Sequence, residues 1–322
     1  MKKTIRSDRK EIVTKIVFVL LFVVLVIYSL VMILSLLWGL ITSLKSTGDF
    51  EKLNNIMGLP NLDANNYFNS RDAFFKLSNY KTVIDNFVVK QTSAYYGLGS
   101  EQIVHRCEAD FGEMLVNTLL YTVGGALIYA VMPAITAYLC AKYNYKLSGI
   151  MVTVYTLMMC MPIVGSAPFE LTFLRNVGLY DSILGNYVQK MTGGGMYFFV
   201  YLAYFKGTSE TYREAAQLDG ASQLRIMATI YFPLAIKIMA TVFLIQFVAL
   251  WDDYQTPLLY LPTHPTLAYG VYYVSFASYA RALHHTPLRI AGLMLLAIPI
   301  IILFAVFKDK LMGDISLGGI KE

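Results

Sequence analysis

Residues 16–41 read IVFVLLFVVLVIYSLVMILSLLWGLI, a run of 26 side chains without a charge. A helix of this length extends about 39 Å at ~1.5 Å per residue, which is enough to cross the ~30 Å hydrocarbon core of a bilayer. The preceding residues 1–15 carry six basic side chains: Lys2, Lys3, Arg6, Arg9, Lys10 and Lys15. Because basic residues accumulate on the cytoplasmic side, the run predicts a first span that starts from a cytoplasmic N-terminus. It is too long for a signal-peptide core, so we expect it to remain in the protein.

The composition of the whole chain excludes a soluble domain. Of the 322 residues, 57% are hydrophobic and 15% are charged, which is too little charge to cover the exterior of a soluble protein. The net charge of +5 does not indicate nucleic-acid binding, because the basic residues flank apolar runs and form no single patch. Cys107, Cys140 and Cys160 are odd in number and far apart, so the sequence predicts neither a disulfide framework nor a zinc site.

Five further apolar segments complete the predicted fold, an all-α integral membrane protein with six transmembrane helices. These spans are expected at residues 114–141, 147–169, 191–205, 238–251 and 290–307. Two of them hold only 15 and 14 uncharged residues (191–205 and 238–251), which is tolerated where neighbouring protein surrounds their ends. Residues 42–113 are then an extracytoplasmic insertion, residues 114–307 the permeation core, and residues 308–322 a cytoplasmic tail.

The distribution of charge supports six spans. With a cytoplasmic N-terminus, six spans place the loop 206–237 in the cytoplasm, and the loop carries Lys206, Arg213, Arg225 and Lys237. Omitting one short span would move the basic C-terminal tail to the outside. Omitting both would move the loop outside, so neither alternative fits the charges.

The insertion at residues 42–113 is polar and too long for a simple turn, and long loops without structure are uncommon. We therefore expect a small ordered insertion with interfacial helices. It is either a solvated connection or a surface for an extracytoplasmic partner, and the sequence favours neither.

The stretch TYREAAQLDGASQLRIMATIYFP, residues 211–233, is a mostly polar island inside the cytoplasmic loop. Thr211 and Glu214 have the spacing of a capping box, which predicts a helix start. Gly220 interrupts the helical pattern, and Pro233 marks the approach to the next span. The pattern predicts two short helices with a bend near Gly220, where small residues allow a partner to approach closely.

The segment Glu214-Ala215-Ala216-x-x-Asp219-Gly220-Ala221 resembles the cytoplasmic EAA loop of bacterial ABC importer permeases. Other matching motifs follow in the family's order: Val116-Asn117-Thr118, Ala137-Tyr138, Met161-Pro162 and Val177-Gly178-Leu179-Tyr180-Asp181-Ser182. Trp251-Asp252-Asp253-Tyr254 resembles the Trp-Asn-Asp-Phe signature of the carbohydrate branch, although Asp252 stands where that branch usually has Asn. The tail Gly318-Gly319-Ile320-Lys321 is similar to that of the smaller maltose-permease subunit.

The resemblance implies a type I, binding-protein-dependent importer of a sugar or oligosaccharide in the bacterial inner membrane. It implies three kinds of partner: a second permease subunit, a dimer of cytoplasmic ATPase subunits and an extracytoplasmic solute-binding protein. A cleft of the ATPase would receive the helices around the EAA motif and couple ATP hydrolysis to alternating access. The coupling residues would be Glu214, Ala215, Ala216, Asp219, Gly220 and Ala221. ATP and Mg would be held by the ATPase, so this chain would carry no cofactor and no enzymatic activity.

Several candidate residues have a second, simpler interpretation. Glu214 either pairs with a basic residue of the ATPase or only caps its own helix. Asn117, Trp251, Asp252 and Tyr254 are candidates for the substrate path. However, Asn117 also fits a hydrogen bond between helices, and the two aromatic residues fit the bilayer interface. Asp252 and Asp253, which directly follow the fifth predicted span, either contact the solute or lie in water at the outer mouth.

Other functions remain as alternatives. No P-loop, G-x-S-x-G or H-E-x-x-H motif occurs, which argues against chemistry in this chain. His284 and His285 are adjacent and therefore point apart, so they predict no metal site. The rivals are a permease for a non-sugar solute such as glycerol phosphate or a polyamine, an intramembrane enzyme, and a secondary transporter. An enzyme would need paired catalytic groups inside the spans, and a secondary transporter would usually show internal repeats with buried ionisable groups.

Overall fold

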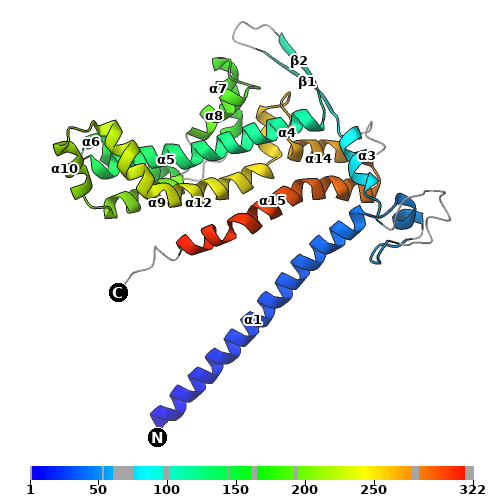
Figure 1. Ribbon diagram of the computed structural model, residues 1–322, viewed down its shortest axis with the longest axis horizontal. Coiled ribbons are helices and arrows are strands. Elements are labelled where there is room, and N and C mark those ends of the chain that lie inside the picture. Colours follow the sequence, from blue (N-terminus) through cyan, green and yellow to red (C-terminus); the bar gives the residue numbers. More distant parts are fainter. Residues whose placement is uncertain are drawn as a thin grey trace. The chain divides into compact units, whose positions relative to one another are not determined.

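The computed structural model describes residues 2–52, 54–60, 75–96, 102–143, 145–160, 165–191, 195–276 and 283–315. Most of these residues are helical, as Figure 1 shows. The chain divides into two compact units, Met1–Asn86 with Tyr279–Leu295, and Phe87–Ser278 with Leu296–Glu322. The motifs at Met161-Pro162 and at residues 318–321 lie outside the described residues.

The first unit is organised by α1 (Lys2–Ser43), whose apolar part, Thr14–Ser43, is long enough to cross a membrane. The chain continues through a π turn, η1 (Gly48–Lys52), and α3 (Ser78–Asn86). The buried Asn79 amide donates hydrogen bonds of 2.8 Å to the carbonyls of Ser43 and Lys45. These bonds fasten the end of α1 to α3, so this part of the predicted insertion is ordered.

The second unit begins with an antiparallel hairpin of β1 (Val89–Tyr96) and β2 (Gln102–Ala109), in which Val89 pairs with Ala109. The all-α prediction is wrong at this point. Two tyrosines of α14 (Leu267–Phe276) donate hydrogen bonds to β1, from Tyr269 to the Gln91 side chain and from Tyr273 to a backbone carbonyl. The hairpin is thus supported by contacts with residues far away in the sequence. The polar residues of the hairpin alone do not predict these contacts.

A long helix runs from Phe111 to Lys142 without interruption. Its parts are α4 (Phe111–Leu119), the π turn η2 (Leu120–Gly124) and α5 (Gly125–Lys142). Asp110 caps its start by accepting a 2.8 Å hydrogen bond from the Glu113 amide. Pro133 lies inside this helix and does not end it.

Another long helix runs from Gln223 to Trp251. Its parts are α11 (Gln223–Ile226), the π turn η3 (Met227–Tyr231) and α12 (Phe232–Trp251). The structure therefore joins what the sequence predicted as two elements, a short helix and a span at 238–251. Pro233 does not separate them, because local π adjustments of the backbone let membrane helices accommodate proline.

The segment predicted as one span at 147–169 is divided between two helices. α6 (Lys146–Cys160) is apolar and has 15 residues, and α7 (Ser166–Val177) is a separate helix. Gly165, directly before α7, has a φ of +84°, a left-handed conformation that no α-helix continues through.

The remaining helices are α8 (Ile183–Met191), α9 (Gly195–Gly207), α10 (Thr211–Leu218), α13 (Gln255–Tyr260) and α15 (Thr286–Ile315). Within the described part of the chain, four helices are long and apolar enough to cross a membrane: Thr14–Ser43, Phe111–Lys142, Gln223–Trp251 and Thr286–Leu303.

The core of the second unit lies between α5, α9 and α12, which run side by side in Figure 1. Small side chains on α5, at Ala130, Ala134 and Ala137, let the neighbouring helices approach closely. Near the end of α5, the Tyr138 ring lies 5.6 Å from the Phe205 ring and 5.0 Å from the Tyr231 ring. This aromatic packing brings the ends of α5 and α9 together with η3, beside α10.

Candidate functional site

The bend after α10 is determined by Gly220. Gly220 has a φ of +76°, a conformation that strains residues with a side chain. Its N–H donates to the Gln217 carbonyl at 3.0 Å, and the Ala221 N–H donates to the Ala216 carbonyl at 2.9 Å. These two hydrogen bonds form a Schellman motif, which closes the C-terminus of α10.

Residues around the bend form an exposed surface. Of the residues predicted to couple to an ATPase, those that are exposed are Glu214, Ala215, Asp219 and Gly220. Ala216 is buried and Ala221 is half-buried, because both pack against the core. Beside them, Leu218 is 90% exposed and Leu224 is 74% exposed. Exposed apolar residues next to a bend of small residues are suited to a cleft in another protein.

The predicted capping box does not form. α10 begins at Thr211, and the Thr211 hydroxyl shares a 2.9 Å hydrogen bond with the Ser209 hydroxyl. The N-cap residue is Glu210, whose side chain does not cap the helix because Lys142 and Arg213 bind its carboxylate. Thr211 therefore lies inside the helix, one position after the place that a capping box requires.

The start of α10 is held by the last residue of α5. The Lys142 side chain is 1% exposed, and its ammonium donates to the Glu210 carboxylate at 2.9 Å and to the Thr208 carbonyl at 2.7 Å. Arg213 donates to the other oxygen of Glu210 at 2.8 Å. Burial by itself would raise the pKa of Glu210, but the two basic partners outweigh it and hold that pKa below its usual value. We call Lys142, Glu210 and Arg213 the loop brace.

Two tyrosines add hydrogen bonds to the residues before and after the bend. The Tyr143 hydroxyl donates to the Gln223 side chain at 2.5 Å, and the Tyr231 hydroxyl donates to the Ser209 carbonyl at 3.4 Å. Ser222 caps α11 through its side chain. As a result, α10 is connected to α5 before the bend, and the helix Gln223–Trp251 begins directly after it.

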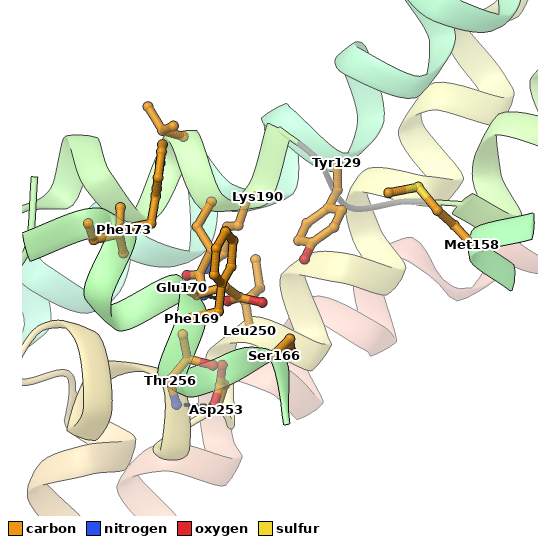
Figure 2. Close-up of a pocket in the computed structure, with 13 residues that line it drawn as sticks. Tyr129, Met158, Ser166, Phe169, Glu170, Phe173, Lys190, Leu250, Asp253 and Thr256 are labelled. Atoms are coloured by element: carbon orange, nitrogen blue, oxygen red, sulfur yellow. Dashed lines mark hydrogen bonds between the residues drawn. The ribbon is translucent and has the colours of Figure 1, made fainter. Parts of the chain in front are cut away.

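A cavity of about 800 Å³ lies elsewhere in the same unit (Figure 2). Most of its wall is apolar, and its polar lining residues are Tyr129, Ser166, Glu170, Gln189, Lys190, Asp253 and Thr256. This volume falls within the ~300–1,000 Å³ of typical small-molecule sites, which combine apolar walls with a few placed polar groups.

Lys190 and Asp253 are linked through Tyr121. The buried Lys190 ammonium lies 4.2 Å from the centre of the Tyr121 ring and donates a 2.7 Å hydrogen bond to Asn186. The Tyr121 hydroxyl donates to the Asp253 carboxylate at 2.6 Å. Burial lowers the pKa of Lys190 to about 8, partly offset by the Asp253 charge, so the side chain is mainly cationic at pH 7.

Two adjacent glycines make room for this arrangement. A Cβ on Gly125 would lie 2.9 Å from the Lys190 stem and 2.8 Å from the Leu250 side chain. A Cβ on Gly124 would overlap Tyr187, whose hydroxyl donates to a backbone carbonyl of η2 at 2.7 Å. The glycine pair thus allows α8 to lie close against the long helix Phe111–Lys142.

Glu170, on α7, is a second carboxylate in the cavity wall. It accepts hydrogen bonds from Gln189 at 2.6 Å and from Tyr260 at 3.1 Å. Burial and the Glu170 charge raise the pKa of Tyr260 to about 12, so its hydroxyl remains a donor at neutral pH. The two donors, from α8 and α13, hold the carboxylate in position.

None of the four residues predicted for the substrate path lines the described cavity. Trp251 and Asn117 are buried and donate hydrogen bonds to backbone carbonyls at 3.1 and 3.2 Å. Tyr254 stacks on a tyrosine of α14 with the ring centres 4.5 Å apart, and Asp252 is exposed. Asp253, one residue further along, is the acidic residue of this motif that lines the cavity.

Nothing in the local sequence groups Glu170, Lys190 and Asp253 together. Each is a charged residue next to an apolar run, and this was the available signal. They come from α7, from α8 and from the turn after α12, so only the fold shows that they belong together. Within the described residues, no three or more His, Cys, Asp or Glu side chains are grouped to hold a metal ion.

Comparisons with known proteins agree with one another. Residues 130–313, more than half of the chain, match a family model described as binding-protein-dependent transport system inner membrane component. The chain is 29% identical to AmyC of Thermoanaerobacterium thermosulfurigenes, a probable starch degradation products transport system permease protein, over 66% of this chain and 77% of the relative. It is 25% identical to MelC of Bacillus subtilis, a melibiose/raffinose/stachyose import permease protein, over 66% of this chain and 77% of the relative. It is 22% identical to NgcG of Streptomyces coelicolor, a diacetylchitobiose uptake system permease protein, over 91% of this chain and 86% of the relative.

A solved structure shares the fold. It is the crystal structure of a bacterial ABC transporter involved in the import of the acidic polysaccharide alginate. One of its chains matches with a TM-score of 0.69 at 20% identity, over 91% of this chain and 96% of that chain. The chain therefore belongs to the family of binding-protein-dependent transport system inner membrane components, and is a multi-pass permease subunit of such an importer.

Proposed function

We propose that this permease subunit imports a sugar or oligosaccharide and is driven by ATP hydrolysis in a separate subunit. The observation that carries the coupling part is the exposed bend at Gly220, which leads directly into the 29-residue helix Gln223–Trp251. The names of three relatives, which refer to starch degradation products, to melibiose and to diacetylchitobiose, support a sugar as the solute.

The proposed topology has six spans: the four long helices together with α6 and α9. α9 has 13 residues, and its side chains Phe198, Tyr201 and Phe205 are fully buried. A helix surrounded by protein can be shorter than the bilayer is thick. With a cytoplasmic N-terminus, six spans put the α10 loop and the C-terminus in the cytoplasm of a bacterial cell.

In this proposal α10 and the bend enter a cleft of a cytoplasmic ATPase dimer, which holds ATP and Mg. Closure of the ATPase displaces α10, and two connections carry the displacement further. The loop brace transmits it to α5, and the continuous helix Gln223–Trp251 transmits it to Asp253 at the cavity. Packed side chains and rigid helices of this kind carry coupling between distant sites.

The remaining partners follow from the same proposal. A second permease subunit completes the translocation path, and a solute-binding protein delivers the sugar from outside. Glu214, Ala215, Ala216, Asp219, Gly220 and Ala221 form the contact with the ATPase in this proposal. For Glu214, an exposed carboxylate beside the bend supports a pairing with a basic residue of the cleft.

Uptake assays test the proposal in cells that depend on this chain together with its own partners. We expect ATP-dependent uptake of at least one neutral oligosaccharide from a panel of maltotriose, raffinose and N,N′-diacetylchitobiose. Uptake of glycerol phosphate or a polyamine, with none of the panel, would contradict the sugar assignment.

Two variants in the same assay test the bend. Gly220→Pro should abolish uptake, because proline fixes φ near −65° and lacks the N–H that closes the Schellman motif. Gly220→Ala is the matched control. No described atom lies within 4 Å of the position that the alanine Cβ would take. The free-energy cost of this substitution is therefore the strain of the left-handed conformation, about 1–2 kcal/mol. Wild-type uptake by Gly220→Pro, at equal membrane content, would contradict the docking role of the bend.

A further inference from the structure

The cavity in Figure 2 holds charged groups that the coupling of the loop to an ATPase does not require. Glu170, Asp253 and the Tyr129 ring surround the same space, and Lys190 lies in its wall. Each charged group is fixed by a neighbour: Glu170 by Gln189, Asp253 by Tyr121, and Lys190 by Asn186. Groups fixed in advance lose little entropy when a ligand binds.

The chemistry of the lining fits a solute rich in hydroxyl groups. A hydroxyl both donates and accepts, so neighbouring hydroxyls of one solute can bind carboxylate and ammonium groups in turn. Tyr129, Phe169 and Phe173 add aromatic rings to the wall. Such rings provide flat apolar faces, which suit the C–H side of a sugar ring.

The charge of the lining disfavours an anionic solute. Two carboxylates, Glu170 and Asp253, and one ammonium, Lys190, give a formal net charge of −1. An anion would be repelled, and this repulsion is stronger in the low dielectric of a cavity than in water. A polyamine has no hydroxyl groups, and its ammonium groups cannot accept a hydrogen bond from the Lys190 ammonium.

The position of Asp253 connects the cavity to the loop. Asp253 follows the C-terminus of α12, the helix that starts at the bend, and it accepts a 3.0 Å hydrogen bond from the Thr256 N–H. Glu170 lies on a different element, α7. A displacement of α12 would therefore move Asp253 relative to Glu170 and change the fit of a solute between them.

We propose that this cavity is a solute-contact site within the subunit itself, which binds neutral polyhydroxylated solutes through Glu170, Lys190 and Asp253. The inference rests on the proposed sugar import and adds to it a location and a preference for uncharged sugars.

Glu170→Gln tests the site, because it keeps the size of the side chain and removes its charge. Uptake is measured with the panel sugar that the wild-type chain transports, with trigalacturonate as an acidic competitor. We expect KM to rise about tenfold with kcat little changed, the size of effect expected for replacing a charged hydrogen-bond acceptor by a neutral one. We also expect stronger inhibition by trigalacturonate, because the lining becomes neutral.

Glu108→Gln is the matched control. It removes a carboxylate that is 64% exposed on β2, so KM and inhibition should stay at wild-type values. Tyr129→Phe is a second, milder variant for the case that Glu170→Gln does not reach the membrane. It keeps the ring and removes one hydroxyl, and we expect KM to rise a few-fold.

Two kinds of failure are distinguishable. Sugar uptake by the wild-type chain with unchanged KM and unchanged inhibition in both cavity variants would overturn the solute site and leave the importer intact. Absence of uptake of any panel sugar by the wild-type chain would overturn the proposed function, and the site with it.

Discussion

Lys142 is a cationic side chain in a buried position, bound on several sides. Besides its bonds to Glu210 and the Thr208 carbonyl, its ammonium lies 5.1 Å from the centre of the Tyr231 ring. Buried charges persist in proteins where they are paired and hydrogen-bonded. Removing the Lys142 side chain would therefore break its contacts between the end of α5 and the start of α10.

Lys142→Met should weaken the coupling between ATP hydrolysis and uptake. The substitution removes the hydrogen bond from Lys142 to the Thr208 carbonyl and leaves Glu210 paired with Arg213. The expected local loss of stabilising free energy is about 1–3 kcal/mol. Measurement of sugar molecules imported per ATP hydrolysed should show a lower ratio, with ATP hydrolysis retained. Lys146→Met, which removes an exposed lysine four residues away, should keep the wild-type ratio. An unchanged ratio in Lys142→Met would show that the loop brace does not transmit force.

Asp252 and Asp253 are neighbours of the same residue type but lie in different surroundings. Both acidic residues follow Trp251, and the motif alone does not determine which one faces the interior. α12 ends at Trp251, and Asp253 turns inward to accept from the Thr256 N–H and the Tyr121 hydroxyl. The hydroxyl comes from a residue 132 positions earlier, so local sequence could not predict the outcome.

The long helices can be predicted directly from their apolar runs. The way in which shorter helices join to form them cannot. The sequence predicted the helical character of the loop and of the following span, and placed the bend near Gly220, where φ is positive. It did not predict that η3 joins α11 to α12, or that the resulting helix continues through Pro233. A π turn is a local change of hydrogen bonding that apolar periodicity does not record.

Deletion of Thr229 tests the role of this π turn. A π turn contains one residue more than the regular helix, so removing one residue there restores an α-helix and keeps both flanks in nearly the same orientation. Deleting Ala240 from the regular part of α12 instead rotates one flank by about 100°, one residue of a helix with 3.6 residues per turn. We expect sugar uptake to survive the deletion of Thr229 at about half of the wild-type rate or more, and to be lost on deletion of Ala240.

The control for both deletions is the membrane content of each chain, measured by immunoblot. Equal loss of uptake at equal membrane content would contradict the interpretation of η3 as an inserted residue.

The β1–β2 hairpin could not have been predicted from apolar periodicity, because its contacts to α14 join residues about 180 positions apart.

The whole molecule has apolar surface that it does not cover itself. In α1, the most apolar 18-residue window of Thr14–Ser43 has no buried residue. In α10 and α11, Leu218 and Leu224 are exposed. Lipid can cover the first surface, and in the proposed function the ATPase covers the second. Composition predicted the membrane character of the chain and the motif at residues 214–221 predicted the docking surface, whereas the exposure of Leu218 and Leu224 became visible only in the fold.

Purification from its own cells should therefore yield a complex. We expect the chain to co-purify with a second permease subunit and with an ATPase, as measured by native mass spectrometry of detergent-solubilised membranes. Leu218→Asp together with Leu224→Asp should reduce recovery of the ATPase while the second permease is retained, because the change is confined to the bend surface. A solitary chain that transports sugar at the full rate would contradict the proposed assembly.

In the proposed solute site, Gly125 would also limit the size of the solute that the cavity holds. A methyl group at this position would meet the Lys190 stem and the Leu250 side chain, so it would push the cavity wall inward from behind. None of the groups proposed to bind the sugar would be replaced. Gly125→Ala and then Gly125→Ser offer a graded series for protein engineering, in which longer oligosaccharides are excluded before shorter ones.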